Sequence, residues 1–264
     1  MKHPMRFAAQ LAFTLFVCAF LVVPVIMSVL AGLSNNFFVG VKSGLTLRWV
    51  LEVWELYAGT VMLSILIALA TLVVTLALGV PAAYVLTLKQ NRFTRAVEEL
   101  LVLPVAVPGL ATALALILFY GELRGFRQSW AFILVGHVLF TLPFMVRSVV
   151  AVMAAIDLKT LEEAAASLGA GFRERFFGVI LPNAMPGILA GSLMVVTLSM
   201  GEFNITWMLH TPLTKTLPVG LADSYASMRL EIGSAYTIVF FVMIVPLLVA
   251  MQWFAGRTKG VTRG

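Results

Sequence analysis

The sequence predicts an all-α membrane protein with six transmembrane helices. Hydrophobic residues make up 61% of the chain and charged residues only 11%, which is far from the balance of a soluble globular domain. The apolar residues also lie in blocks about as long as a bilayer-spanning helix, and not in the short amphipathic runs of a soluble bundle. A single transmembrane domain over residues 1–264 is the simplest organisation that fits.

Six stretches without charged residues can each hold about 20 helical residues, the number needed to cross the hydrocarbon core. The first follows Lys2 and Arg6, and its apolar core is longer than that of a signal peptide, so we treat it as a helix. In the third, Pro104, Pro108 and Gly109 predict a broken or bent helix, because proline removes a backbone donor that lipid cannot replace. The expected spans are approximately residues 9–31, 60–88, 100–120, 129–150, 185–208 and 233–255.

The distribution of lysine and arginine predicts the orientation of these helices. With six spans both termini lie on the same side, and the loops and termini of that side hold twelve of the cations against six on the other side. The positive-inside rule therefore places both termini and the loop at 154–183 in the cytoplasm. The net charge of +6 does not indicate nucleic-acid binding, because the cations flank the apolar blocks and do not cluster with exposed aromatic residues. The cations expected on the cytoplasmic side are Lys2, Arg6, Lys89, Arg92, Arg95, Arg147, Lys159, Arg173, Arg175, Arg257, Lys259 and Arg263. Those expected on the opposite side are Lys42, Arg48, Arg124, Arg127, Lys215 and Arg229.

The loop at 154–183 has the pattern of two short helices joined by a sharp turn. Thr160 followed by Glu163 is a capping-box pattern, and the alanines after Glu163 are strong helix formers. Gly169 suits the left-handed position that ends a helix. A second helix should begin near Phe172 and stop at Pro182, so that the two form a knob able to enter a groove on a partner protein.

The same loop resembles the signature loop of permease subunits from binding-protein-dependent type I ABC importers. That signature runs E-A-A, three residues, G, nine residues, an isoleucine, one residue, and L-P. Here Glu163-Ala164-Ala165, Gly169 and Leu181-Pro182 match it, and Val179 replaces the isoleucine.

The resemblance implies the type I ABC importer permease fold, a multi-pass position in the bacterial inner membrane, and a cytoplasmic coupling helix seated in a cleft of an ATPase. Glu163 would pair with a cationic or polar group of the ATPase, Gly169 would permit the turn, and the two alanines would allow close packing. Alternatively, the segment is only a well-capped surface helix. The implied ATPase-coupling residues are Glu163, Ala164, Ala165, Gly169, Ala170, Phe172, Leu181 and Pro182.

The implied partners are a similar or identical second permease, two ABC ATPase subunits, a periplasmic solute-binding protein and membrane lipid. No Gly-Lys dipeptide occurs, so the chain has no P-loop, and ATP and Mg²⁺ would be bound by the separate ATPase. The single cysteine, Cys18, excludes a disulfide within the chain and a metal site built from thiolates. We therefore expect a non-catalytic subunit without a cofactor of its own.

The end of the fifth span carries the candidate translocation-pathway residues Glu202, Phe203, Asn204 and Trp207. A carboxylate within the hydrocarbon is costly, so Glu202 should face water or the protein interior, unless it lies at the membrane interface. His137 lacks a carboxylate or second histidine at helical spacing, and an interhelical hydrogen bond is expected for it.

The region Leu198–Glu202 looks most like permeases for spermidine and putrescine, although aminophosphonate, ferric-iron and thiamine permeases are similar. For a polyamine, Glu202 would attract ammonium groups, and Phe203, Trp207 or Tyr225 would add cation–π contacts. An ion-coupled secondary transporter should show inverted repeats and paired intramembrane charges, and an intramembrane enzyme should show a catalytic motif. Neither set of features is found convincingly.

Overall fold

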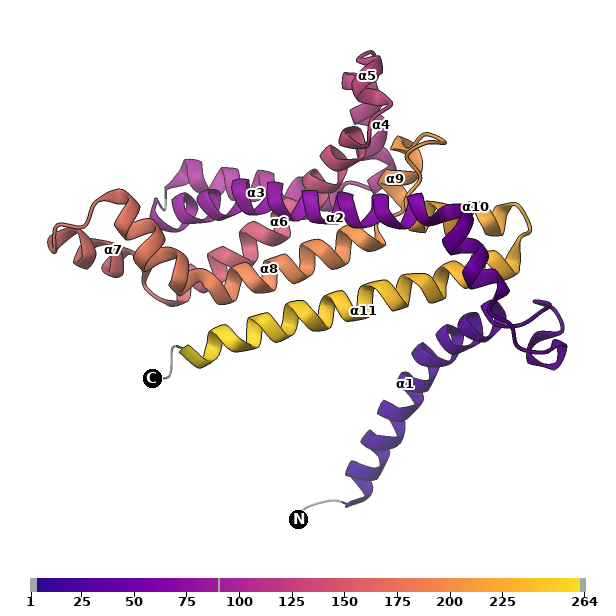
Figure 1. Ribbon diagram of the computed structural model, residues 1–264. Helices are drawn as coiled ribbons and strands as arrows, with labels where there is room; N and C mark the ends of the chain where they lie inside the picture. The colour runs from indigo at the N-terminus through magenta and orange to yellow at the C-terminus, as the bar shows by residue number, and fades with distance from the viewer. Residues whose placement is uncertain (1–3, 90, 262–264) are drawn as a thin grey trace. The chain divides into compact units, whose positions relative to one another are not determined.

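A computed structural model describes residues 4–89 and 91–261, with side chains over 7–89 and 91–253. The described chain is almost entirely helical, and its one β contact is an isolated bridge between Ser34 and Leu45, so the all-α prediction is confirmed. The elements, labelled in Figure 1, are α1 Pro4–Gly32, η1 Gly40–Ser43, α2 Arg48–Leu88, α3 Arg92–Ala106, α4 Gly109–Tyr120, α5 Arg124–Arg127, α6 Trp130–Ala155, α7 Leu158–Ser167, η2 Glu174–Ile180, α8 Leu181–Gly201, α9 Asn204–Leu209, α10 Leu217–Ala226 and α11 Leu230–Val261.

Five described helical stretches are long and apolar enough to cross a membrane, and α3 and α4 together make a sixth if their bent pair counts as one span. The bend between α3 and α4 is 104° and confirms the predicted break. Val107 is extended, with φ −83° and ψ 132°, because the ring of the following Pro108 disfavours the helical conformation. Pro104 stays inside α3, so the break is made by the second proline.

The chain divides into two compact units, residues 1–59 with 220–243 and residues 60–219 with 244–264. In the first unit, the end of α1 meets the start of α11 at Gly32, where a Cβ atom would lie 2.7 Å from the Ser234 carbonyl carbon. Arg229 joins the start of α2 by an ion pair of 2.6 Å to Glu52 and a 2.6 Å hydrogen bond to the Tyr57 hydroxyl.

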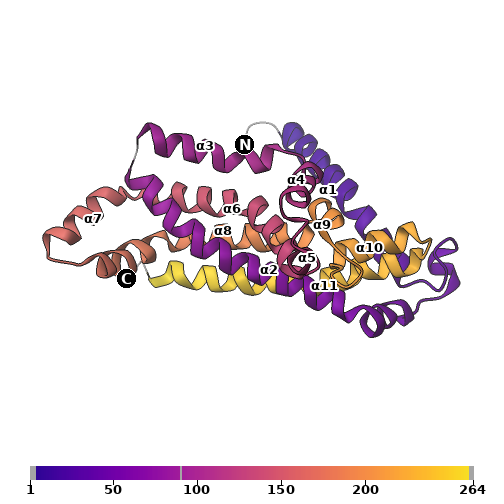
Figure 2. The same cartoon turned by 90° about the horizontal axis from the view of Figure 1, so that it is seen from above.

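In the second unit, α6 and α8 run side by side (Figures 1 and 2). Glycines let the two backbones approach closely, as is typical of membrane helices. The Ser148 hydroxyl donates to the Gly187 carbonyl at 2.9 Å, and a Cβ atom at Gly191 would lie 2.8 Å from the Met145 sulfur.

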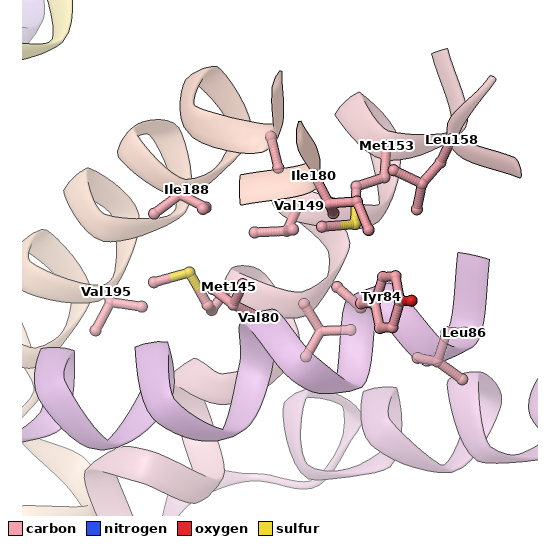
Figure 3. Packing of buried hydrophobic residues seen from close by; sticks show 13 residues of the cluster. Val80, Tyr84, Leu86, Met145, Val149, Met153, Leu158, Ile180, Ile188 and Val195 are labelled. Atoms are coloured by element: carbon pink, nitrogen blue, oxygen red, sulfur yellow. The ribbon is translucent and has the colours of Figure 1, made fainter. Parts of the chain in front are cut away.

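The main hydrophobic core of this unit joins the end of α2 to α6, η2 and α8. Figure 3 shows Val80 and Tyr84 of α2 beside Met145 and Val149 of α6. Leu158, the first residue of α7, is only 1% exposed and belongs to the same core. The core therefore fixes the start of α7 against the transmembrane bundle.

Candidate functional site

The first half of the predicted loop is the ten-residue helix α7. The predicted capping box is wrong, because the helix begins at Leu158 and Thr160 lies in its first turn. The first helical residue, Leu158, is buried, and Asp157 before it has a left-handed backbone with φ 46°. The Thr160 hydroxyl instead donates to the Asp157 carboxylate at 2.7 Å.

The predicted glycine turn after α7 is confirmed. Gly169 has φ +87°, a conformation that side chains disfavour, although a Cβ atom there would meet nothing within 4 Å. The Ala170 amide donates to the Ala165 carbonyl and the Gly169 amide donates to the Ala166 carbonyl, at 3.1 and 3.0 Å. This pair of bonds is a Schellman motif, which closes the helix without side-chain help.

Most of the sequence-predicted coupling residues lie on the outer surface of this loop. Glu163 has a side chain that is 69% exposed and lies 3.8 Å from Lys159, while Ala164 and Gly169 are exposed as well. Phe172 is 57% exposed. Ala165, Ala170 and Leu181 are half-buried, and Pro182 is exposed. The structure thus presents a firmly terminated helix with an accessible glutamate.

The second half of the loop differs from the prediction, because Pro182 does not stop a helix. Residues 172–201 are continuously helical, and Glu174–Ile180 within them form the π-helix η2. The Leu181 amide donates to the Phe176 carbonyl five residues back, which is the π pattern. A proline has no amide hydrogen to donate, and its ring crowds the carbonyl four residues earlier. The wider π turn before Pro182 makes room for the ring. The Asn183 side chain donates to the Val179 carbonyl at 2.7 Å.

The fifth predicted span, 185–208, begins earlier than expected and is interrupted, because α8 ends at Gly201 and α9 starts at Asn204. Glu202 in this break is 8% exposed. Its Oε1 accepts from the Ile205 amide at 2.7 Å, and its Oε2 accepts from the Thr206 amide at 2.8 Å and the Thr206 hydroxyl at 2.7 Å. Both carboxylate oxygens therefore cap the N-terminus of α9.

His137 of α6 links this cap to α8, which confirms the predicted interhelical hydrogen bond. Its Nδ1 lies 2.8 Å from the Ser199 hydroxyl oxygen and its Nε2 lies 2.8 Å from the Thr206 hydroxyl oxygen. Because the Thr206 hydroxyl donates to Glu202, it must accept from Nε2–H, and Nδ1 then accepts from Ser199. The hydrogen bonds run in one direction toward the carboxylate and select the Nε2–H tautomer.

The other end of α9 is also held by a charged side chain. Arg127 donates from Nη1 to the Leu209 carbonyl at 2.7 Å, at the helix C-terminus where a cation is favourable. The helix packs closely against α6, where a Cβ atom at Gly136 would lie 2.6 Å from Ile205 Cγ2. Short as it is, α9 is fixed at both ends and along one side.

The structure separates the predicted pathway residues into two groups. Glu202 is buried in the polar cluster with His137, whereas Asn204 and Trp207 are exposed. Phe203 is half-buried and its ring lies 5.3 Å from that of Trp207. Tyr225 belongs to the other compact unit, where its hydroxyl lies 2.9 Å from Ser234 Oγ.

Sequence reasoning missed Ser199 and Thr206, the two hydroxyls that complete the cluster. The signal was present, since Thr206 follows Glu202 by four residues and Ser199 precedes it by three, the spacings of neighbours on one helix face. These spacings predict proximity only within a continuous helix, however, and the helix is interrupted between Gly201 and Asn204.

Curated permeases resemble this chain over about three quarters of its length. The molybdate/tungstate transport system permease protein WtpB of Pyrococcus abyssi is 26% identical over 197 residues, 74% of this chain and 77% of the relative. The putrescine transport system permease protein PotI of Escherichia coli K12 is 29% identical over 213 residues, 76% of this chain and 74% of the relative.

A solved structure shares the fold. It is a chain of a bacterial ABC transporter involved in the import of the acidic polysaccharide alginate, with a TM-score of 0.74 and 14% identity over 97% of this chain and 96% of that one. Residues 75–260 match the family described as the inner membrane component of binding-protein-dependent transport systems. This match includes the α7 loop and the α8–α9 region, and the chain belongs to that family of ABC importer permeases.

Proposed function

We propose that this protein is the non-catalytic membrane-spanning subunit of an ATP-driven importer and that α7 is its coupling helix. The observation that carries the proposal is the exposed surface of α7 with its accessible Glu163, on a helix that is fixed by core burial of Leu158 and ends in a Schellman turn. Figure 1 shows α7 at one end of the second unit, beyond the ends of α6 and α8. An exposed, rigidly attached helix of this kind suits a groove on an ATPase.

In this mechanism the subunit works with a similar or identical permease, two ATPase subunits that bind ATP and Mg²⁺, and a periplasmic solute-binding protein. ATP closes the ATPase pair, the α7 helices follow, and the transmembrane helices rotate so that the pathway opens toward the binding protein. Hydrolysis reverses the motion. Coupling of this kind requires that the ATPase bind the two conformations with different affinity.

For the solute, we propose a tetrahedral oxyanion or the phosphonate group of an aminophosphonate in preference to a polyamine. The polyamine hypothesis comes from the resemblance of Leu198–Glu202 to spermidine and putrescine permeases, and the ammonium contact that it implies needs a free carboxylate at Glu202, whereas both oxygens of that carboxylate accept bonds from α9. Similarity to a molybdate/tungstate permease supports an oxyanion, and similarity to a putrescine permease keeps the polyamine as the alternative. For ferric iron and thiamine, the support is limited to the resemblance of Leu198–Glu202 to permeases for those solutes.

The test of the coupling assignment is a reconstituted complex in which Glu163 is changed to Lys or Gly169 to Val. Reversing the charge on α7 or straining its turn should reduce uptake at least about tenfold. This corresponds to a loss of about 1.4 kcal/mol in the binding of α7 to the ATPase. Glu122→Gln, at an exposed residue outside α7, is the matched control. Unchanged uptake together with unchanged solute-stimulated ATP hydrolysis would contradict the assignment.

The solute class is tested by binding assays on the partner solute-binding protein with molybdate, sulfate, an aminophosphonate and spermidine. We expect affinity for one of the first three and none for spermidine. Uptake by the reconstituted complex should follow the same order. Binding and uptake of spermidine alone would reject the oxyanion proposal and leave the importer assignment intact.

A further inference from the structure

Glu162, the neighbour of the exposed Glu163, has the opposite environment. Its side chain is 15% exposed, and its Oε1 accepts a 2.5 Å hydrogen bond from the Tyr84 hydroxyl of α2. Arg175 Nη1 of η2 lies 3.4 Å from the same oxygen. One carboxylate oxygen therefore connects α2, α7 and η2.

Aromatic packing reinforces this junction. The ring of Tyr84 lies 5.4 Å from that of Phe176 in an edge-to-face arrangement and 6.2 Å from that of Phe172. Phe172 and Phe176 are stacked with their centroids 5.8 Å apart. In Figure 3, the Tyr84 ring lies within the core that also holds Ile180 and Leu158. The polar junction is thus shielded from water on the side of the core.

The charges at this junction depend on each other. Arg175 is 25% exposed, and its Nε atom is buried with no hydrogen-bond partner among the residues the structure describes. Removing Glu162 would leave the guanidinium partly buried without its counter-charge, and removing Arg175 would leave the carboxylate with only the Tyr84 hydroxyl. Such mutual dependence fixes geometry more strictly than apolar packing alone, because hydrogen bonds are directional.

We propose that Glu162, Tyr84 and Arg175 form a clasp that makes α7, η2 and the end of α2 move as one body during transport. The inference rests on the proposed function, since a coupling helix transmits motion only if it is rigidly attached to the helices that line the pathway. Glu162 is a positioning residue in this role. It acts through the placement of α7 and not through contact with the ATPase.

The test compares Glu162→Gln, Tyr84→Phe and Arg175→Gln in the complete reconstituted complex. Each variant should assemble and keep its basal ATP hydrolysis, while the number of solute molecules imported per ATP falls at least about threefold. Tyr84→Phe removes one hydroxyl and keeps the aromatic ring, so it tests the clasp even if a charged variant fails to assemble. Glu99→Gln, which changes an exposed carboxylate on α3, should behave as wild type.

The charge-swapped double variant Glu162→Arg with Arg175→Glu separates the clasp from an ATPase contact. If the two residues act on each other, the swap should recover at least half of the lost import per ATP. No recovery, or an unchanged import ratio in Tyr84→Phe, would overturn the clasp. A wild-type complex without solute-stimulated ATP hydrolysis would instead reject the proposed function, so the two failures can be told apart.

Discussion

At the scale of single residues, Glu202 shows how a carboxylate is accommodated in an apolar region. Such a group must be solvated by water or by protein donors, and here two amides and a hydroxyl serve. The sequence predicts that Glu202 needs partners, but it does not identify them. The amides of Ile205 and Thr206 become free donors only because the chain breaks before α9 and starts a new helix.

Changing Glu202 to Gln should destabilise the protein by about 1.5–3 kcal/mol, the usual contribution of hydrogen bonds to a charged group. The reason is that the new amide nitrogen would face a backbone or hydroxyl donor where an oxygen now accepts. Thermal unfolding in detergent measures the loss, with Glu122→Gln as the exposed control expected within about 0.5 kcal/mol of wild type. A stable Glu202→Gln protein that has lost transport would argue for a solute contact instead.

At the scale of elements, the sequence predicts which segments are helical better than where each helix begins and ends. The span expected at 60–88 is close to the observed one, because the helix that begins at Arg48 is kinked at Tyr57, where the backbone is non-helical with φ −127° and ψ 16°, and its second part ends at Leu88. The break before α9 and the π-helix before Pro182 both depend on side chains meeting in three dimensions. The bend at Pro108 was predictable, since a local steric conflict causes it.

The packing of α9 against α6 should be sensitive to Gly136→Ala. The added Cβ atom would lie 2.6 Å from Ile205 Cγ2 and 3.0 Å from Leu209 Cδ1, so that the Ile205 side chain or one of the two helices must shift. Overpacking of this kind costs about 1–3 kcal/mol, which a lower unfolding temperature should reveal. Gly125→Ala is the matched control, because its Cβ atom would meet nothing within 4 Å. Equal stability of the two variants would show that α9 is not held in this position.

At the scale of the whole molecule, composition alone predicts the membrane class and the all-α fold. The loop signature predicts the family, and the matched residues 75–260 confirm it. The orientation rests on the lysine and arginine count and stays a prediction. Neither composition nor the loop signature predicts the solute. The carboxylate proposed to contact it, Glu202, instead accepts hydrogen bonds from the first amides of α9.

Orientation can be measured with a membrane-impermeant maleimide on single-cysteine variants in a Cys18→Ser background. Both Lys42 and Lys159 are exposed and flank different spans. Lys42→Cys should react in intact cells with a permeable outer membrane, and Lys159→Cys should react only after the inner membrane is opened. The reverse pattern would mean that α7 lies on the side of the binding protein, which is incompatible with its proposed role.

The π-helix η2 has a consequence for how chains of this family can differ in length. A π turn holds more residues than an α turn, so deleting one residue between Glu174 and Ile180 can return the segment to α geometry without opening its hydrogen-bond ladder. Because the wider turn takes up the extra residue, such a deletion would change the orientation of α7 relative to α8 by much less than the roughly 100° that one residue turns in an α-helix. The same deletion inside α8 would displace every buried residue that follows. Sequence alignments of related chains should therefore place one-residue gaps in η2, and such a gap would leave both the coupling surface and the fold largely in place.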